Sequence, residues 1–298
     1  MAAKWGCGVE DATLHQLVKR LGGRAQKQAV ERVETLAVEA HPQRAPSRLG
    51  VLLADGWLVR HRGPGWGYKK TQQKRVEWHE MKMGVYYQVE QAAERRAGRA
   101  ELVEKAVVST LGDAVELGER LHWEALRRGL ARARNLEMLG DGAHWIWNLK
   151  QDRWARAVEV LDFYHGSEHV WALGRALKGE AQAKGWVEPL LHQVRHGQEK
   201  RALRQIARLS VPRGERGQLV RQEQGYFAGQ EHRRNYQQLA ARGWPIGSGA
   251  VESACRQRQG RFKRPGQFWT AQGLRNLCAL EEARHNHHWE ELWNQGGS

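Results

Sequence analysis

The run LGVLLADGWLVR, from Leu49 to Arg60, constrains the fold of this chain more than any other stretch. It is apolar on both sides of the pair Asp55-Gly56, and a short apolar run of this kind predicts a strand that is buried in a sheet. A carboxylate in such a strand is costly to bury without a partner or a metal ion. Two interpretations stay open: either the strand ends at an Asp-Gly turn, or Asp55 belongs to a functional site.

Later segments alternate between strand and helix patterns. The β-branched and aromatic residues from Val76 to Val89 predict a second strand, antiparallel to the first. Further strands are predicted at 104–110, 134–139 and 157–163, and helices at 113–129 and, capped by Ser167, at 169–179. This order predicts an α+β fold in which a mixed sheet is flanked by helices.

Outside this core the pattern is mostly helical. Residues 1–47 carry apolar positions three and four apart on both sides of Gly22-Gly23, which predicts two helices joined by a glycine turn. They form either the remnant of a DNA-binding helix-turn-helix or an ordinary helical hairpin. Residues 179–245, rich in Gln, Arg, Lys and Ala, predict a mostly helical insertion that divides the core into 48–178 and 246–298. The last part is predicted to hold the final helices.

The charge of the chain restricts its partners. Lys and Arg total 48 against 33 Asp and Glu, a formal net charge of +15. Such an excess favours a polyanion, most often nucleic acid, because each neutralised phosphate releases counterions. The three cysteines form no CxxC pair, which predicts a reducing cytosol and neither a disulfide framework nor a cysteine zinc site. No apolar run reaches the roughly 20 residues that cross a bilayer, so no membrane partner is expected.

Two more acidic residues are candidates for chemistry. Asp141 begins a second Asp-Gly pair after the strand predicted at 134–139, and it is either a turn residue or an acid at a strand end. Glu252 lies in GSGAVESACR, at the start of a helix with Ser248 as its N-cap, and it either pairs with Arg256 on the surface or faces a site. Converging carboxylates can hold two divalent metal ions for phosphoryl transfer, and Mg²⁺ needs only oxygen ligands.

Two further segments of the chain contain clustered histidines. Asp162 and His165 form a DxxH motif, with His169 one helical turn further on. These residues either bind a metal ion or support the core by hydrogen bonds, and support is favoured because phosphoryl transfer on Mg²⁺ does not need imidazole. The histidines of RHNHHW near the end of the chain are expected to be solvated rather than to bind zinc.

Two stretches interleave basic and aromatic side chains, WGYKKTQQKR at 66–75 and RQRQGRFKRPGQFW at 256–269. Arg and Lys hold phosphates while aromatic rings stack on bases, although a solvated basic loop has the same composition. The second stretch follows Glu252, where a DNA end would have to enter. The predicted DNA-binding residues are Lys69, Lys70, Arg256, Arg258, Arg261, Lys263 and Arg264.

Five motifs carry a family resemblance: ADG at 54–56, GDGAHWIW at 140–147, LDFYHGSEHVWAL at 161–173, YFAGQEHRRNYQQLAARGWPIGSGAVESACR at 226–256 and GRFKRPGQFWTAQGLRNLCAL at 260–280. With them the chain resembles bacterial insertion-sequence transposases of the Kra type, which are related to Mutator-like transposases. The resemblance runs from about Val51 to Trp293. The third and fourth motifs are long and specific, whereas the short Asp-Gly motifs are informative through their order.

The resemblance implies an RNase H-like fold with a DDE triad of Asp55, Asp141 and Glu252. These acids would hold two Mg²⁺ ions, or Mn²⁺, and catalyse DNA strand cleavage and strand transfer of an insertion sequence. The implied partners are the transposon ends and target DNA, bound by a homodimer or larger synaptic complex at the nucleoid in the bacterial cytoplasm. Asp162 and His165 match a motif that Mutator-related transposases carry between the second acid and the Glu, in a supporting role. Asp162 is also the alternative second acid.

Two alternative functions are compatible with the same basic charge. Family members carry a longer N-terminal DNA-recognition region than the about 45 residues that precede the predicted core, so one alternative is a truncated or catalytically inactive DNA-binding remnant. The other is an RNase H-like nuclease that acts on RNA or hybrid duplexes. The nuclease shares the core chemistry and differs only in its substrate.

Overall fold

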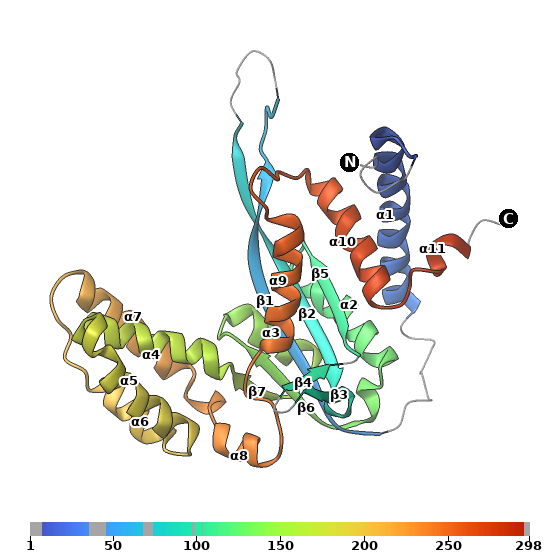
Figure 1. Ribbon diagram of the computed structural model, residues 1–298. Helices are drawn as coiled ribbons and strands as arrows, with labels where there is room; N and C mark the ends of the chain where they lie inside the picture. Colours follow the sequence, from blue (N-terminus) through green and yellow to red (C-terminus); the bar gives the residue numbers. More distant parts are fainter. Residues whose placement is uncertain (1–7, 36–45, 68–73, 97–98, 103, 295–298) are drawn as a thin grey trace. The chain divides into compact units, whose positions relative to one another are not determined.

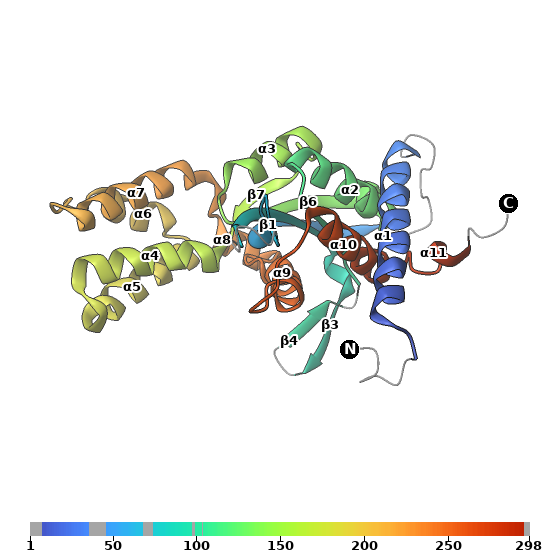
Figure 2. The ribbon, with the colours of Figure 1, turned by 90° about the horizontal axis from the view of Figure 1, so that it is seen from above.

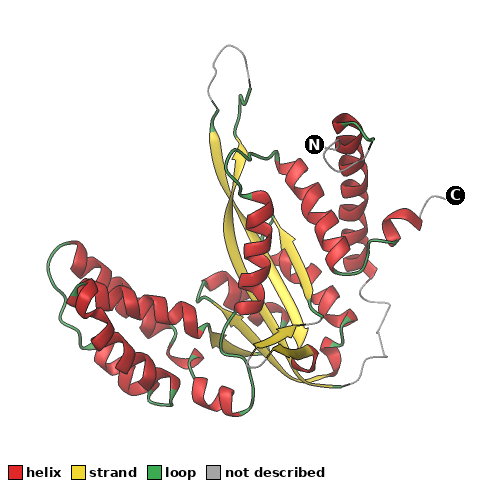
Figure 3. Ribbon diagram, in the orientation of Figure 1, coloured by secondary structure: helices red, strands yellow, loops and turns green. Residues whose placement is uncertain are grey.

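Five strands form one mixed sheet in the computed structural model, which describes residues 8–35, 46–67, 74–96, 99–102 and 104–294 (Figure 1). The strand order is β5-β2-β1-β6-β7. The strands are β1 (Ser47–Arg62), β2 (Val76–Gln88), β5 (Ala106–Thr110), β6 (Ala133–Gly140) and β7 (Val158–Leu161), and β3 (Ala92–Arg96) pairs separately with β4 (Arg99–Leu102). The pairs β1–β2 and β2–β5 are antiparallel, whereas β6–β7 is parallel. The predicted α+β class with a mixed sheet flanked by helices is confirmed (Figure 3).

The chain divides into two compact units. Unit 1 comprises 1–135 and 250–298, and unit 2 comprises 136–249. The end of unit 2 lies close to the predicted boundary at 245, but its start lies far before the predicted boundary at 178. The physical reason is packing: helix α4 (Phe163–Lys178), expected to close the first part of the core, contacts α5 (Glu180–Arg195) and α7 (Glu215–Gly229) of the predicted insertion.

Strand β1 runs without a break through Asp55. Its residues from Leu49 to Ala54 are buried, which is why the sequence there is continuously apolar. Asp55 pairs with Met83 and Gly56 with Lys82, and the strand continues to Arg62. The interpretation of Asp55-Gly56 as a strand-ending turn is therefore wrong.

The N-terminal segment is one helix, α1 (Asp11–Glu34), and not two. Gly22 is buried inside it, and a Cβ there would lie 2.5 Å from the Cβ of Asn276 on α10 (Ala271–His285). Gly22 thus lets α1 pack closely on α10, and the two helices lie side by side in Figures 1 and 2. The predicted glycine turn is wrong, and with it the helix-turn-helix interpretation, because periodicity does not distinguish a turn from a contact.

The other helices of unit 1 largely follow the predictions. Helix α2 (Ala114–Arg127) begins after Asp113, whose carboxylate accepts from the backbone N of Glu116. Helix α10 is capped by Thr270, and α9 (Gly249–Phe262), which leads into unit 1, begins directly after Ser248. A short helix, α11 (Glu291–Asn294), follows. Among the described residues, none of the helices combines the length and apolarity that a membrane span requires.

Unit 2 comprises β7, most of β6 and several helices. Helices α5, α6 (Glu199–Ala207), α7 and α8 (Tyr236–Ala241) confirm that 179–245 is mostly helical (Figure 3). Helix α3 (His144–Arg153), between the two strands, is absent from the predicted order, because its aromatic start is equally typical of a strand. The predicted cap of α4 is wrong: α4 begins after Asp162, and the hydroxyl of Ser167 donates to the carbonyl of Phe163 within the helix.

Candidate active site

Two of the three predicted acids meet in unit 1. Asp55 lies within β1, and Glu252 lies in the first turn of α9. The buried thiol of Cys255, one turn after Glu252, donates to Sδ of Met83 at 3.5 Å, and Met83 is the residue of β2 that pairs with Asp55. Burial raises the pKa of this thiol strongly, and the charges of Asp55 and then Glu252 raise it further. Both carboxylates are therefore close to one sulfur atom.

The two carboxylates differ in environment but are both accessible. Asp55 is half-buried, and one of its oxygens accepts from the backbone N of Gly56 at 2.7 Å, whereas Glu252 is exposed. Oxygen ligands of this kind suit Mg²⁺, which keeps several of its waters. Among the described residues, no group of three or more His, Cys, Asp or Glu side chains is arranged to hold a metal ion.

Asp141 lies in unit 2, in a tight turn just after β6. Its Oδ1 accepts from the backbone N of Ala143 at 2.9 Å, and Gly142 has a φ of 104°, which favours glycine. The hydroxyl of Tyr226 donates to the Asp141 carbonyl at 2.9 Å, and the side-chain amide of Gln230 donates to the Gly142 carbonyl at 3.0 Å. Asp141 is therefore a turn residue, which was one of its two interpretations. Tyr226 of α7 and Gln230, which directly follows α7, hold this turn by hydrogen bonds.

Asp162 has another role. It is buried, its Oδ1 accepts from the backbone N of His165 at 2.8 Å, and its Oδ2 accepts from the backbone N of Ser248. The carboxylate caps α4 and fixes the residue from which α9 begins. Because Asp162 is buried and both its oxygens accept from backbone amides, its carboxylate is less accessible than that of the half-buried Asp141.

The side chains of His165 and His169 face each other, with their Nε2 atoms 3.2 Å apart. Nδ1 of His169 lies 2.6 Å from a carboxylate oxygen of Glu223, and its ring stacks on that of Tyr226 at 3.8 Å between centroids. Sequence reasoning missed Glu223 and Tyr226. Tyr226 is the first residue of the long motif at 226–256, which was a usable signal, whereas no local pattern marked Glu223.

The predicted DNA-binding residues divide into buried and accessible ones. Arg258 is 5% exposed and pairs with Glu281 at 3.2 Å, so it supports the packing of α9 and α10 rather than offering its charge to a phosphate. Arg256, Arg261 and Arg264 are exposed, although Arg261 also pairs with Glu281. Lys263 is half-buried, with its Nζ 5.6 Å from the ring centroid of Trp78. Lys69 and Lys70 lie outside the described residues.

Two of the accessible arginines, Arg261 and Arg264, line a basic hollow of unit 1. Lys105, Arg258, Arg261, Arg264, Arg284 and His285 line it together with Glu281. Burial lowers the pKa of Lys105. Burial and then the charge of Arg258 lower the pKa of His285 to about 4, so its ring is neutral at pH 7. The net charge of the hollow is positive, as a contact to nucleic-acid phosphates requires.

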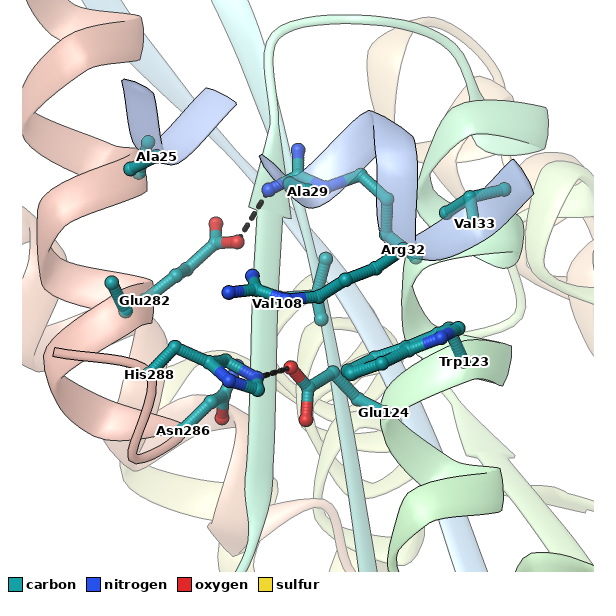
Figure 4. Close-up of a pocket in the computed structure, with 13 residues that line it drawn as sticks. Ala25, Ala29, Arg32, Val33, Val108, Trp123, Glu124, Glu282, Asn286 and His288 are labelled. Carbon is teal, nitrogen blue, oxygen red and sulfur yellow. Dashed lines mark hydrogen bonds and ion pairs between the residues drawn. The ribbon is translucent and has the colours of Figure 1, made fainter. Parts of the chain in front are cut away.

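His288 corrects the expectation that the C-terminal histidines are solvated. It is 2% exposed, and its two ring nitrogens lie 2.6 Å from Glu124 and 2.8 Å from Glu291. Burial opposes ionisation of Glu124, but the His288 hydrogen bond and the charge of Arg128 lower the pKa of Glu124 below its usual value. Figure 4 shows this ion pair in a small pocket that α1, α2, β5 and α10 line. Its lining does not include Asp55 or Glu252, so it belongs to the packing of unit 1.

Comparison of the chain with protein-family models and with curated proteins gave no match.

Proposed function

We propose that this chain is the catalytic core of a DNA transposase of the DDE type, with Asp55, Asp141 and Glu252 as its acids. One observation carries the proposal. Asp55, in the middle of a buried strand, and Glu252, from a helix far along the chain, come together around Cys255. A carboxylate in a buried strand lowers the stability of the fold unless it is hydrogen-bonded, paired or bound to a metal ion. Its presence in β1 therefore favours a functional role. Its meeting with a second, exposed carboxylate is what a metal-dependent phosphoryl-transfer site needs.

The residues of the chain would have distinct tasks in this reaction. When bound, Mg²⁺ or Mn²⁺ supplies activation of the attacking oxygen and stabilisation of the leaving oxygen. The strand holds Asp55 rigidly, and α9 presents Glu252 from its first turn. Tyr226 and Gln230 orient the turn that carries Asp141. The exposed Arg256 and Arg264 would bind the DNA backbone next to the acids.

The finer fold assignment and the partners belong to the same proposal. A mixed sheet whose first strand carries one acid, and whose strand β6 ends just before another, supports an RNase H-like core. The charge of +15 supports DNA as the partner, namely transposon ends and target. The homodimer or larger synaptic complex and the location at the nucleoid of the bacterial cytoplasm rest on the resemblance alone.

The test is strand cleavage and joining on labelled DNA taken from the borders of the element that encodes the chain, with Mg²⁺ or Mn²⁺. Asp55→Asn, Asp141→Asn and Glu252→Gln should each lower the cleavage rate by at least about 100-fold, because each removes a charged metal ligand. Glu188→Gln is the matched control, since Glu188 is an exposed residue of unit 2 that pairs with Lys184.

The outcomes separate the proposal from its alternatives. Cleavage and joining that need all three acids support the transposase. Binding of DNA without cleavage, unchanged by Asp141→Asn, identifies a non-catalytic remnant and overturns the proposal. Cleavage of RNA–DNA hybrids but not of the DNA ends identifies a nuclease instead.

A further inference from the structure

Two histidines of α4 direct their ring nitrogens at a common point. His165 and His169 are one helical turn apart, and their Nε2 atoms are separated by 3.2 Å. A Zn²⁺ ion binds imidazole nitrogen at about 2.0–2.1 Å, so two nitrogens at a tetrahedral angle on one ion lie about 3.3 Å apart. The observed separation, which is within hydrogen-bonding range, also matches that of two ligands of a single ion.

Glu223 of α7 orients one ring of this pair. It is 4% exposed, and its carboxylate oxygen lies 2.6 Å from Nδ1 of His169. Because a carboxylate accepts, Nδ1 of His169 donates to Glu223, and Nε2 is the ring nitrogen that faces His165. A carboxylate behind the ring is the usual means by which proteins orient a metal-binding histidine. The stacked ring of Tyr226 fixes the plane of the same imidazole.

We propose that His165 and His169 bind a transition-metal ion such as Zn²⁺, with Glu223 as the positioning carboxylate. The two histidine side chains are 37% and 24% exposed, so an ion and its waters can reach them. Since no larger group of metal-binding side chains exists in the described part of the chain, water completes the coordination. The ion would reinforce the contact between α4 and α7.

This site differs in chemistry from the three acids. Imidazole nitrogen suits Zn²⁺, Ni²⁺ and Cu²⁺, whereas Mg²⁺ prefers oxygen. Asp162, which also belongs to the DxxH motif, is outside the proposed ligand set, because it is buried and its two oxygens cap α4 and accept from the backbone N of Ser248. An excess of Mg²⁺ should therefore not displace the ion from the histidines.

The test is calorimetric titration of Zn²⁺ into the full, tag-free and metal-free chain, with the visible spectrum of bound Co²⁺ as a second readout. We expect one tightest ion per chain, unaffected by Mg²⁺. His165→Ala and His169→Ala should abolish this binding. Glu223→Gln should weaken it by about 10–100-fold, as loss of a carboxylate behind a metal-binding histidine does. Circular dichroism of each variant shows whether the chain keeps its wild-type helix content.

The chain offers a matched control pair. His192 and His196 are also four residues apart, with ring centroids at 4.3 Å, but both are exposed near the end of α5. His192→Ala should leave the tightest Zn²⁺ affinity unchanged. Retention of that affinity in folded His169→Ala, or its loss in His192→Ala, overturns the inference. Because the readout is metal binding and not cleavage, its result is independent of whether the proposed transposase activity is found.

Discussion

The roles of Asp162 and Asp141 can be separated by replacing each carboxylate with the isosteric amide. In Asp162→Asn, the amide oxygen can still accept from the backbone N of His165, so the cap of α4 is largely kept. The amide nitrogen then faces the backbone N of Ser248, two donors toward each other. The variant thus removes one charge-assisted hydrogen bond at a buried place and leaves a buried N–H without an acceptor.

The cost follows from the loss of that hydrogen bond. An unsatisfied buried polar group costs about 1–3 kcal/mol, so Asp162→Asn should lower the free energy of unfolding by this amount. Asp162→Ala also removes the N-cap and should cost about 2–5 kcal/mol. Asp141→Asn should cost less than about 1 kcal/mol, because its amide oxygen still accepts from the backbone N of Ala143 in a half-buried turn.

The assay is urea unfolding followed by circular dichroism, together with strand cleavage on labelled DNA. Asp162→Asn should unfold at lower urea, and Asp141→Asn should unfold near the wild-type midpoint while losing cleavage. If Asp162→Asn is as stable as wild type but inactive, and Asp141→Asn is active, the reasoning is refuted and Asp162 is the second acid.

Three further predictions test separate contacts. Burial raises the pKa of Glu137 to about 9, and neither of its carboxylate oxygens has a hydrogen-bond partner among the described residues. The folded chain thus keeps a proton that the unfolded chain releases above about pH 4.5, so wild-type stability should fall by up to about 1.4 kcal/mol per pH unit between pH 5 and 9. Glu137→Gln should flatten this profile in urea titrations at several pH values, and parallel profiles would contradict the prediction. Gly22→Ala should destabilise unit 1 by about 1–3 kcal/mol in thermal unfolding, because the added Cβ meets Asn276. Gly23→Ala, whose Cβ has nothing within 4 Å, should stabilise unit 1 by up to about 1 kcal/mol. Equal shifts in the two variants would show that α1 does not pack on α10 as described. Tyr226→Phe removes the hydroxyl that donates to the Asp141 carbonyl, and it should lower the free energy of unfolding by about 0.5–1.5 kcal/mol. In single-turnover kinetics the variant should cleave DNA more slowly without binding it more weakly. An unchanged cleavage rate would exclude this positioning role.

The local pattern of the sequence determined the class of the fold. Apolar runs predicted β1 and β7, apolar periodicity predicted α2, and capping residues such as Asp113 and Thr270 lie at the starts of the helices that follow them. These elements were predictable because strand and helix periods and N-caps depend on neighbours within a few residues. The same locality explains why the helical character of 179–245 was predictable.

Only the tertiary structure decided what the individual polar residues and glycines do. Gly22 serves a contact with α10, Asp162 binds two backbone amides, and Arg258 and His288 are buried in ion pairs. Each of these roles depends on a partner far along the chain, and a local pattern carries no information about that partner. For the same reason, the sequence marked Asp55 as unusual, but only the fold showed that Glu252 lies close to it around Cys255.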